Sequence, residues 1–140
     1  MLFSKIFSFM TPPKVRWVMK RRRVSKAPSH AAYVKHKEVA RTLVHERLEY
    51  FNRHYGFTYG RVAIRDQRSR WGSCSKKGNL NFNYRIALLP SHLVDYIVVH
   101  ELCHLREFNH SPKFWALVTQ TIPQHRIYRH ELHTKRMTMQ

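Results

Sequence analysis

Two histidines and a glutamate at a fixed spacing are the residues of this sequence best suited to catalysis. The segment VVHELCHL, residues 98–105, places His100 and His104 four positions apart, with Glu101 directly after the first histidine. On a helix, side chains four apart project from one face, so both imidazoles can reach one zinc ion at about 2.0–2.1 Å. Zinc acidifies a water molecule, and a glutamate placed beside it can take the proton. The pattern indicates a hydrolase that activates water.

A catalytic zinc site needs a third protein ligand and an open position for water. His110 lies six residues after His104, and a helix that ends near Asn109 can turn back to bring it to the same metal. We therefore expect Zn²⁺ at His100, His104 and His110, although an all-histidine site also suits nickel, copper or cobalt. The C-terminal tail offers three other third ligands: His125, His130 and Glu131.

The residues around the motif predict a buried helix. The flanking positions are apolar: Ile97, Val98, Val99, Leu102 and Leu105. Burying histidines and a glutamate in such a helix is costly unless they are paired or bind a metal. Cys103 is expected to be a small buried residue, and Glu107 to accept the second N–H of a ligand histidine. The histidine spacing equals that of the metzincins, but Glu107 replaces their turn glycine, which predicts a different zincin branch.

The positions before this helix predict one long helix and a small sheet. Apolar residues recur every three to four positions from about residue 31 to 54, which predicts an amphipathic helix that stops at Gly56. Residues 61–66, 70–75 and 80–89 have strand composition and are separated by polar turn residues. They predict two or three antiparallel strands.

Serines mark the starts of the later helices. Ser91 is the expected N-cap of the histidine-bearing helix, and Asn109 its end. Ser111 is expected to cap another helix with Pro112 at its first position, where a missing N–H costs nothing. The tail from 124 to 140 is basic and is expected to be partly helical.

Arginines close to the strands are candidates for substrate binding. Arg68, Arg70 and Arg85 are positive charges that can bind a carboxylate, a phosphate or a developing oxyanion. We expect Arg68 and Arg70 to bind substrate, and Arg85 or Tyr128 to hold the oxyanion. The alternative is a solvated strand edge with Trp71 in the core.

Composition predicts one basic domain. The chain has 140 residues and a formal net charge of +18, and half of this excess lies in the first 40 residues. We divide it into a basic extension, residues 1–30, and a metallohydrolase domain, residues 31–140. The extension is expected to be a solvated tail or to bind nucleic acid or an anionic membrane surface weakly.

The sequence lacks the features expected of a membrane-spanning or disulfide-stabilised protein. No stretch approaches the roughly 18 apolar residues that span a bilayer. Cys74 and Cys103 do not suggest a disulfide framework. We therefore expect a cytoplasmic protein.

Three linked motifs resemble one family. The run SRWGSCS at 69–75 is followed by G-x-L-x-x-N-x-R and then by HELCHLxxxNHSPxFW. This combination resembles the YgjP-like zinc metallopeptidases, which are related to the SprT and WLM zincins, over about residues 33–130. The resemblance implies an α+β, zincin-like fold, with a small antiparallel sheet packed on an active-site helix and helices at both ends. It also implies zinc ligands at His100, His104 and His110, and catalysis by Glu101.

Three functions are compatible with these residues. The first is a zinc-dependent metallopeptidase in which Glu101 is the general base. The second, described for similar proteins, is a metal-dependent nucleotide (UTP) pyrophosphatase. The third is a nucleic-acid-associated protease, as among the SprT relatives.

Overall fold

The computed structural model describes residues 27–138. Residues 1–26 of the predicted basic extension, with the surface contacts expected of them, lie outside the described residues. The described elements follow one another as α1 (Ala27–Tyr55), β1 (Val62–Arg65), β2 (Gly72–Cys74), β3 (Leu80–Asn83), the 3₁₀ helix η1 (Tyr84–Leu88), α2 (Ser91–Cys103), α3 (Pro112–Thr121) and α4 (His125–Thr138). The predicted α+β class is confirmed.

The three strands form a mixed sheet with the order β1-β3-β2. β2 pairs with β3 antiparallel, as predicted, but β1 pairs with β3 in parallel, so the expectation of a fully antiparallel sheet is wrong for that pair. The central position belongs to β3, of which Leu80, Phe82 and Asn83 are buried. The most buried strand thus obtains a neighbour on each side, and β2 is left at an edge.

The strand predicted over 80–89 ends at Asn83, and residues 84–88 form η1 instead. The buried Asn83 amide explains the change of direction. Its Nδ2 donates to the carbonyls of Gln67 at 2.7 Å and Arg70 at 3.1 Å, while its Oδ1 accepts the backbone N–H of Arg85 at 3.1 Å. An asparagine that satisfies backbone groups in this way favours a cap over a continued strand.

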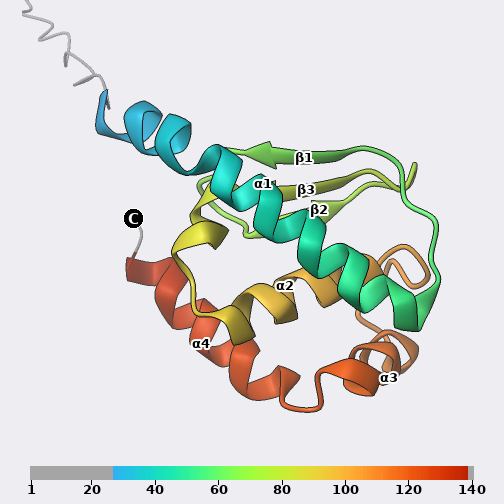
Figure 1. Cartoon of the computed structure of the whole chain (residues 1–140). Coiled ribbons are helices and arrows are strands. Elements are labelled where there is room, and N and C mark those ends of the chain that lie inside the picture. Colours follow the sequence, from blue (N-terminus) through green and yellow to red (C-terminus); the bar gives the residue numbers. More distant parts are fainter. Residues whose placement is uncertain (1–26, 139–140) are drawn as a thin grey trace, which may run out of the picture.

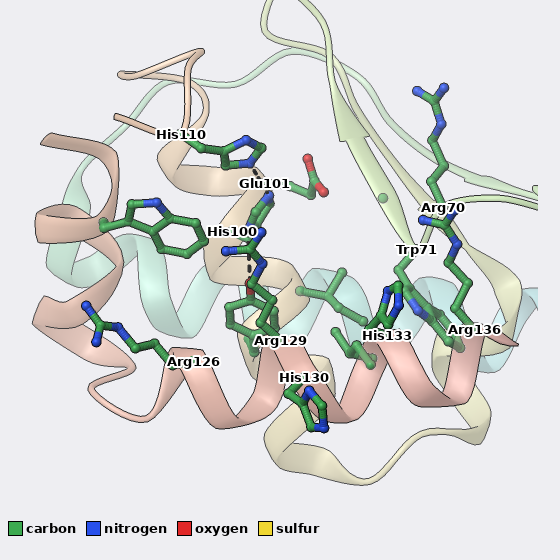
Figure 2. A pocket seen from close by; sticks show the side chains of 15 residues that line it. Arg70, Trp71, His100, Glu101, His110, Arg126, Arg129, His130, His133 and Arg136 are labelled. Atoms are coloured by element: carbon green, nitrogen blue, oxygen red, sulfur yellow. Dashed lines mark hydrogen bonds between the residues drawn. The ribbon is translucent and has the colours of Figure 1, made fainter. Parts of the chain in front are cut away.

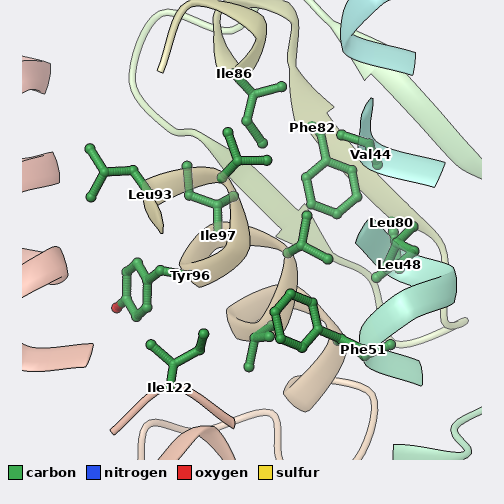
Figure 3. Packing of buried hydrophobic residues seen from close by; sticks show 14 of the residues in the cluster. Val44, Leu48, Phe51, Leu80, Phe82, Ile86, Leu93, Tyr96, Ile97 and Ile122 are labelled. Carbon is green, nitrogen blue, oxygen red and sulfur yellow. The ribbon is translucent and has the colours of Figure 1, made fainter. Parts of the chain in front are cut away.

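Helix α2 occupies the centre of the molecule. It lies between the sheet and the pair α3 and α4, and α1 runs across the sheet and α2 (Figure 1). Side chains from α1, β3 and α2, among them Val44, Phe82 and Ile97, meet in one core (Figure 3). Arg47 of α1 and Asp95 of α2 form an ion pair, with Nη2 to Oδ2 at 3.0 Å.

The helix ends agree with the sequence in part. Gly56 follows α1 with a φ of 65°, a conformation that glycine adopts without strain. Ser111 caps α3 by accepting the N–H of Phe114 at 3.4 Å, with Pro112 in the first turn. Ser91, however, is the first residue of α2 and no side chain caps that helix, which ends at Cys103 rather than near Asn109. None of the helices described between residues 27 and 138 could cross a membrane.

Burial predicts different costs for one substitution at two helical valines. Val98 of α2 is 0% exposed, whereas Val39 of α1 is 57% exposed. We expect Val98→Ala to lower the free energy of unfolding by about 2 kcal/mol, because it leaves a cavity, and Val39→Ala to change it little. Urea unfolding of both variants measures the difference. Equal losses would contradict the central position of α2.

Candidate metal centre

Three imidazole nitrogens converge at the C-terminal end of α2. The Nε2 atoms of His100, His104 and His110 lie 3.1, 3.1 and 3.2 Å from one another. Ligands placed tetrahedrally about 2.0–2.1 Å from zinc are separated by about 3.3–3.4 Å. The arrangement therefore fits a zinc-type ion held by three histidines. The first two come from the helix and its last turn, and His110 reaches them from the segment before α3.

The other ring nitrogens are oriented by neighbouring groups. Nδ1 of His104 lies 3.0 Å from the backbone carbonyl of Glu107, and Nδ1 of His100 lies 3.4 Å from the hydroxyl of Tyr96. If Nδ1 donates in each case, Nε2 keeps its lone pair for a metal. Glu107 thus contacts His104, one of the expected ligands, through its backbone, because the turn after α2 brings its carbonyl back to the ring.

The histidines are held in their neutral form. Burial, followed by the neighbouring imidazoles of His104 and His110, lowers the pKa of His100 to about 3. Burial also lowers the pKa of His104 and of His110. A neutral imidazole is the form that binds a metal, so the cluster needs no deprotonation near neutral pH.

Glu101 is held between α2 and the edge strand β2. Its side chain is only 6% exposed, and burial raises its pKa to about 8, against the opposing effect of Arg70. A Cβ atom on Gly72 would lie 2.8 Å from Cγ and from Oε1 of Glu101, closer than real Cβ contacts. Gly72 therefore leaves the space that the glutamate occupies. Figure 2 shows the carboxylate next to His110, facing the cleft.

The structure brings one of the predicted arginines to this site and leaves the other two away from it. Arg70 lines the cleft with Glu101, whereas Arg68 does not. Arg85 donates to Asp66 at 3.0 Å and to the carbonyl of Gln67 at 3.1 Å, outside the cleft. Its charge is therefore already neutralised by a carboxylate.

Tyr128 and the alternative third ligands have other neighbours. The ring of Tyr128 lies 4.9 Å from that of His92, and Tyr128 is not among the residues lining the cleft. Oε2 of Glu131 lies 2.9 Å from Nε2 of His92. His125 stacks on Trp115 at 4.8 Å, and His130 lines the cleft without joining the three histidines. The geometry thus favours His110 as the third ligand.

The site opens into a cleft of about 770 Å³ with one wall formed by α4. Three arginines of that wall were absent from the sequence-based candidates: Arg126, Arg129 and Arg136. A signal for them exists, because spacings of three and seven residues place them on one face of a helix. Nothing in the sequence indicates that this face turns toward the histidines.

Known proteins share both the sequence pattern and the fold. The family described as YgjP-like, metallopeptidase domain, matches residues 16–135, which begins inside the predicted extension. The crystal structure of the metallopeptidase zymogen of Pyrococcus abyssi abylysin has a TM-score of 0.61 and 26% identity, and the match covers 66% of this chain and 93% of that chain. No curated protein sequence matches this chain.

A second solved structure has the same fold. The metallopeptidase zymogen of Methanocaldococcus jannaschii jannalysin has a TM-score of 0.54 and 22% identity, and the match covers 69% of this chain and 95% of that chain. The two structures confirm the predicted similarity to zincin-like metallopeptidases at the level of the fold.

Loss of one histidine tests the metal centre. We expect His110→Ala to reduce bound metal from about one ion per chain to a small fraction, because two imidazoles bind zinc much more weakly than three. His45→Ala, on an exposed position of α1, is the matched control and should keep its metal. Elemental analysis after gel filtration measures both. Full metal content in His110→Ala would contradict the proposed ligand set.

The raised pKa of Glu101 predicts how the stability of the metal-free protein depends on pH. Above pH 4.5 the carboxyl ionises in the unfolded chain, but it stays protonated in the folded protein up to a pKa of about 8. The unfolded state then binds fewer protons, so the stability of the folded state falls as the pH rises through this window. Histidines with lowered pKa act in the opposite direction below about pH 6.5.

Comparison with Glu101→Gln isolates this effect. In EDTA, the unfolding free energy of the wild type should fall relative to that of the variant as the pH rises from about 5 to about 8. Urea unfolding at a series of pH values measures it. Parallel pH profiles for the two proteins would show that burial does not raise the pKa of Glu101.

Proposed function

Because the chain belongs to the YgjP-like metallopeptidase family, we propose that it is a zinc peptidase in which Glu101 is the general base. The single observation that carries the proposal is the position of this buried carboxylate beside three convergent imidazoles. A raised pKa suits a group that takes a proton from water and returns it to a leaving amine.

The donor set supports zinc as the metal. Three neutral imidazoles, from His100, His104 and His110, are typical of catalytic zinc sites and leave one position open. A zinc ion bound there supplies Lewis-acid chemistry, which polarises a carbonyl and lowers the pKa of water. Glu101 would accept the proton of that water, and Arg70 keeps a positive charge near the reacting groups.

An extended substrate can bind along the edge of the sheet. Among residues 27–138, β2 pairs with β3 alone and its other edge has no strand beside it. Gly72, Ser73 and Cys74 line a second part of the cleft with Glu101. Main-chain pairing with an edge strand holds a peptide in a fixed register. This supports a peptide as the substrate.

The surroundings are proposed to be cytoplasmic. Cys74 and Cys103 are both free thiols, one of them half-buried and the other buried. A chain that relies on no disulfide is compatible with a reducing compartment.

The cleft arginines favour one other candidate function. Arg70, Arg126 and Arg129 could bind the phosphates of a nucleotide, as a UTP pyrophosphatase would require. A pyrophosphate-release assay over the four nucleoside triphosphates, with and without added zinc, distinguishes this activity from peptide hydrolysis. The third hypothesis, a nucleic-acid-associated protease as among the SprT relatives, stays a prediction.

Substitution of the proposed base tests the mechanism. We expect Glu101→Gln to bind zinc as the wild type does, since the ligands are unchanged, and to lose at least about 100-fold in kcat on an unfolded polypeptide. Elemental analysis and a fluorescent casein digest measure the two properties. An active Glu101→Gln would show that another group takes the proton. A wild type that does not digest casein but releases pyrophosphate from a nucleoside triphosphate would favour the nucleotide function.

A further inference from the structure

The cleft beside the histidines is basic on one side. Arg126, Arg129 and Arg136 line it from α4, and Arg70 lines it from the opposite wall (Figure 2). All four arginines are exposed to solvent. Of the described residues that line either part of the cleft, Glu101 is the only acidic one.

The three arginines of α4 form no ion pair with a carboxylate among the described residues, whereas Arg70 acts on the carboxyl of Glu101. All eight acidic residues of the sequence fall between residues 27 and 138. Four of them form ion pairs with other arginines: Glu38, Glu49, Asp66 and Asp95. Glu131 contacts His92 at 2.9 Å. Most of the acidic residues therefore have partners away from the α4 arginines, which leaves these arginines able to pair with the carboxylates of a ligand.

Among the arginines of α4, Arg129 is the one whose charge acts on the histidine cluster. Its charge acts on His100 and on His110, and Figure 2 shows its guanidinium in front of His100. The guanidinium also lies 5.4 Å from the centre of the Trp115 ring, which holds it over the cleft. A carboxylate bound by Arg129 would therefore belong to a residue next to the scissile bond.

Resting on the peptidase function above, we propose that the substrate is an acidic peptide whose carboxylates bind Arg126, Arg129 and Arg136 on one side of the scissile bond. The part of the cleft on the other side, about 330 Å³, contains Ser73, Cys74 and Phe108 and has Arg70 as its only arginine. The preference for acidic residues is therefore one-sided.

The spacing of the arginines suits a peptide better than a nucleotide. Arg126 and Arg136 are ten residues apart on α4, a rise of about 15 Å along the helix. An extended peptide covers that distance with about four to five residues. Several carboxylates along a chain can each meet an arginine, whereas a triphosphate concentrates its charge at one point. Arginine pairs with carboxylate through two parallel hydrogen bonds, which adds geometric selection.

The test uses the full chain loaded with zinc and a set of quenched peptides with one core sequence. Acidic, neutral or basic residues are placed on the N-terminal side, on the C-terminal side or on both sides of the core, and mass spectrometry identifies the cleaved bond. Each peptide is made with blocked and with free ends, so that side-chain and terminal carboxylates are distinguished. We expect acidic residues on one side only to raise kcat/KM roughly tenfold, an effect that weakens in high salt.

Two triple variants separate the cleft from the net charge. Arg126→Gln, Arg129→Gln and Arg136→Gln together should remove the preference, so that kcat/KM for the acidic peptide becomes about equal to kcat/KM for the neutral peptide in the same variant. Arg61→Gln, Arg65→Gln and Arg106→Gln together remove the same charge from exposed positions outside the cleft and should keep the preference. Equal kcat/KM for acidic and neutral peptides in the wild type, or equal losses in both triple variants, would overturn the proposal while the peptidase function stands.

A binding measurement tests the carboxylate site without catalysis. Fluorescence anisotropy with zinc-loaded Glu101→Gln and a labelled acidic peptide should give a dissociation constant that rises about tenfold in the cleft triple variant only. Failure of every peptide to be cleaved would reject the peptidase function, and this assay would still decide whether the arginines bind carboxylates. If UTP or single-stranded DNA of the same charge binds more tightly than the peptide, and the cleft variant abolishes it, the acidic-peptide proposal is wrong.

Discussion

Three lone pairs directed at one point repel one another unless a cation lies between them, and the rest of the fold is arranged around that constraint. Two of the nitrogens, on His100 and His104, are fixed by a helix whose other faces are buried on all sides. The third, on His110, depends on a turn that ends the helix early and on a second helix that begins at Pro112. The central helix α2 therefore has to hold its two histidines rigidly, and the segment after it has to fold back so that His110 reaches them.

The reactivity of Glu101 is set by opposing influences. Burial favours its neutral form, whereas Arg70 favours the carboxylate. A cation bound by the three histidines would add positive potential beside Glu101, which would move the balance toward the ionised form that can accept a proton. In the proposed function, Arg70 would thus support base catalysis, and the arginines of α4 would select the substrate.

The sequence was most informative where function depends on local spacing. The histidines, Glu101 and the cap at Ser111 follow from distances along one or two helical turns. Sheet order and the position of α4 depend on contacts between distant residues, such as the bond between His92 and Glu131, and no local pattern encodes them. The strand predicted over residues 80–89 ends at Asn83 for the same reason. The Asn83 side chain donates to two carbonyls that lie 13 and 16 residues away in the sequence.

The position of His110 outside the helix has a consequence for metal exchange. An ion bound by all three histidines cross-links the end of α2 to the start of α3, so binding energy and the closure of residues 105–111 are thermodynamically linked. His110 is the one proposed ligand that lies outside α2 and its last turn, so its release would not require α2 to unfold. The lifetime of the holoenzyme would then be governed by how often this one turn opens, more than by the intrinsic affinity of three imidazoles.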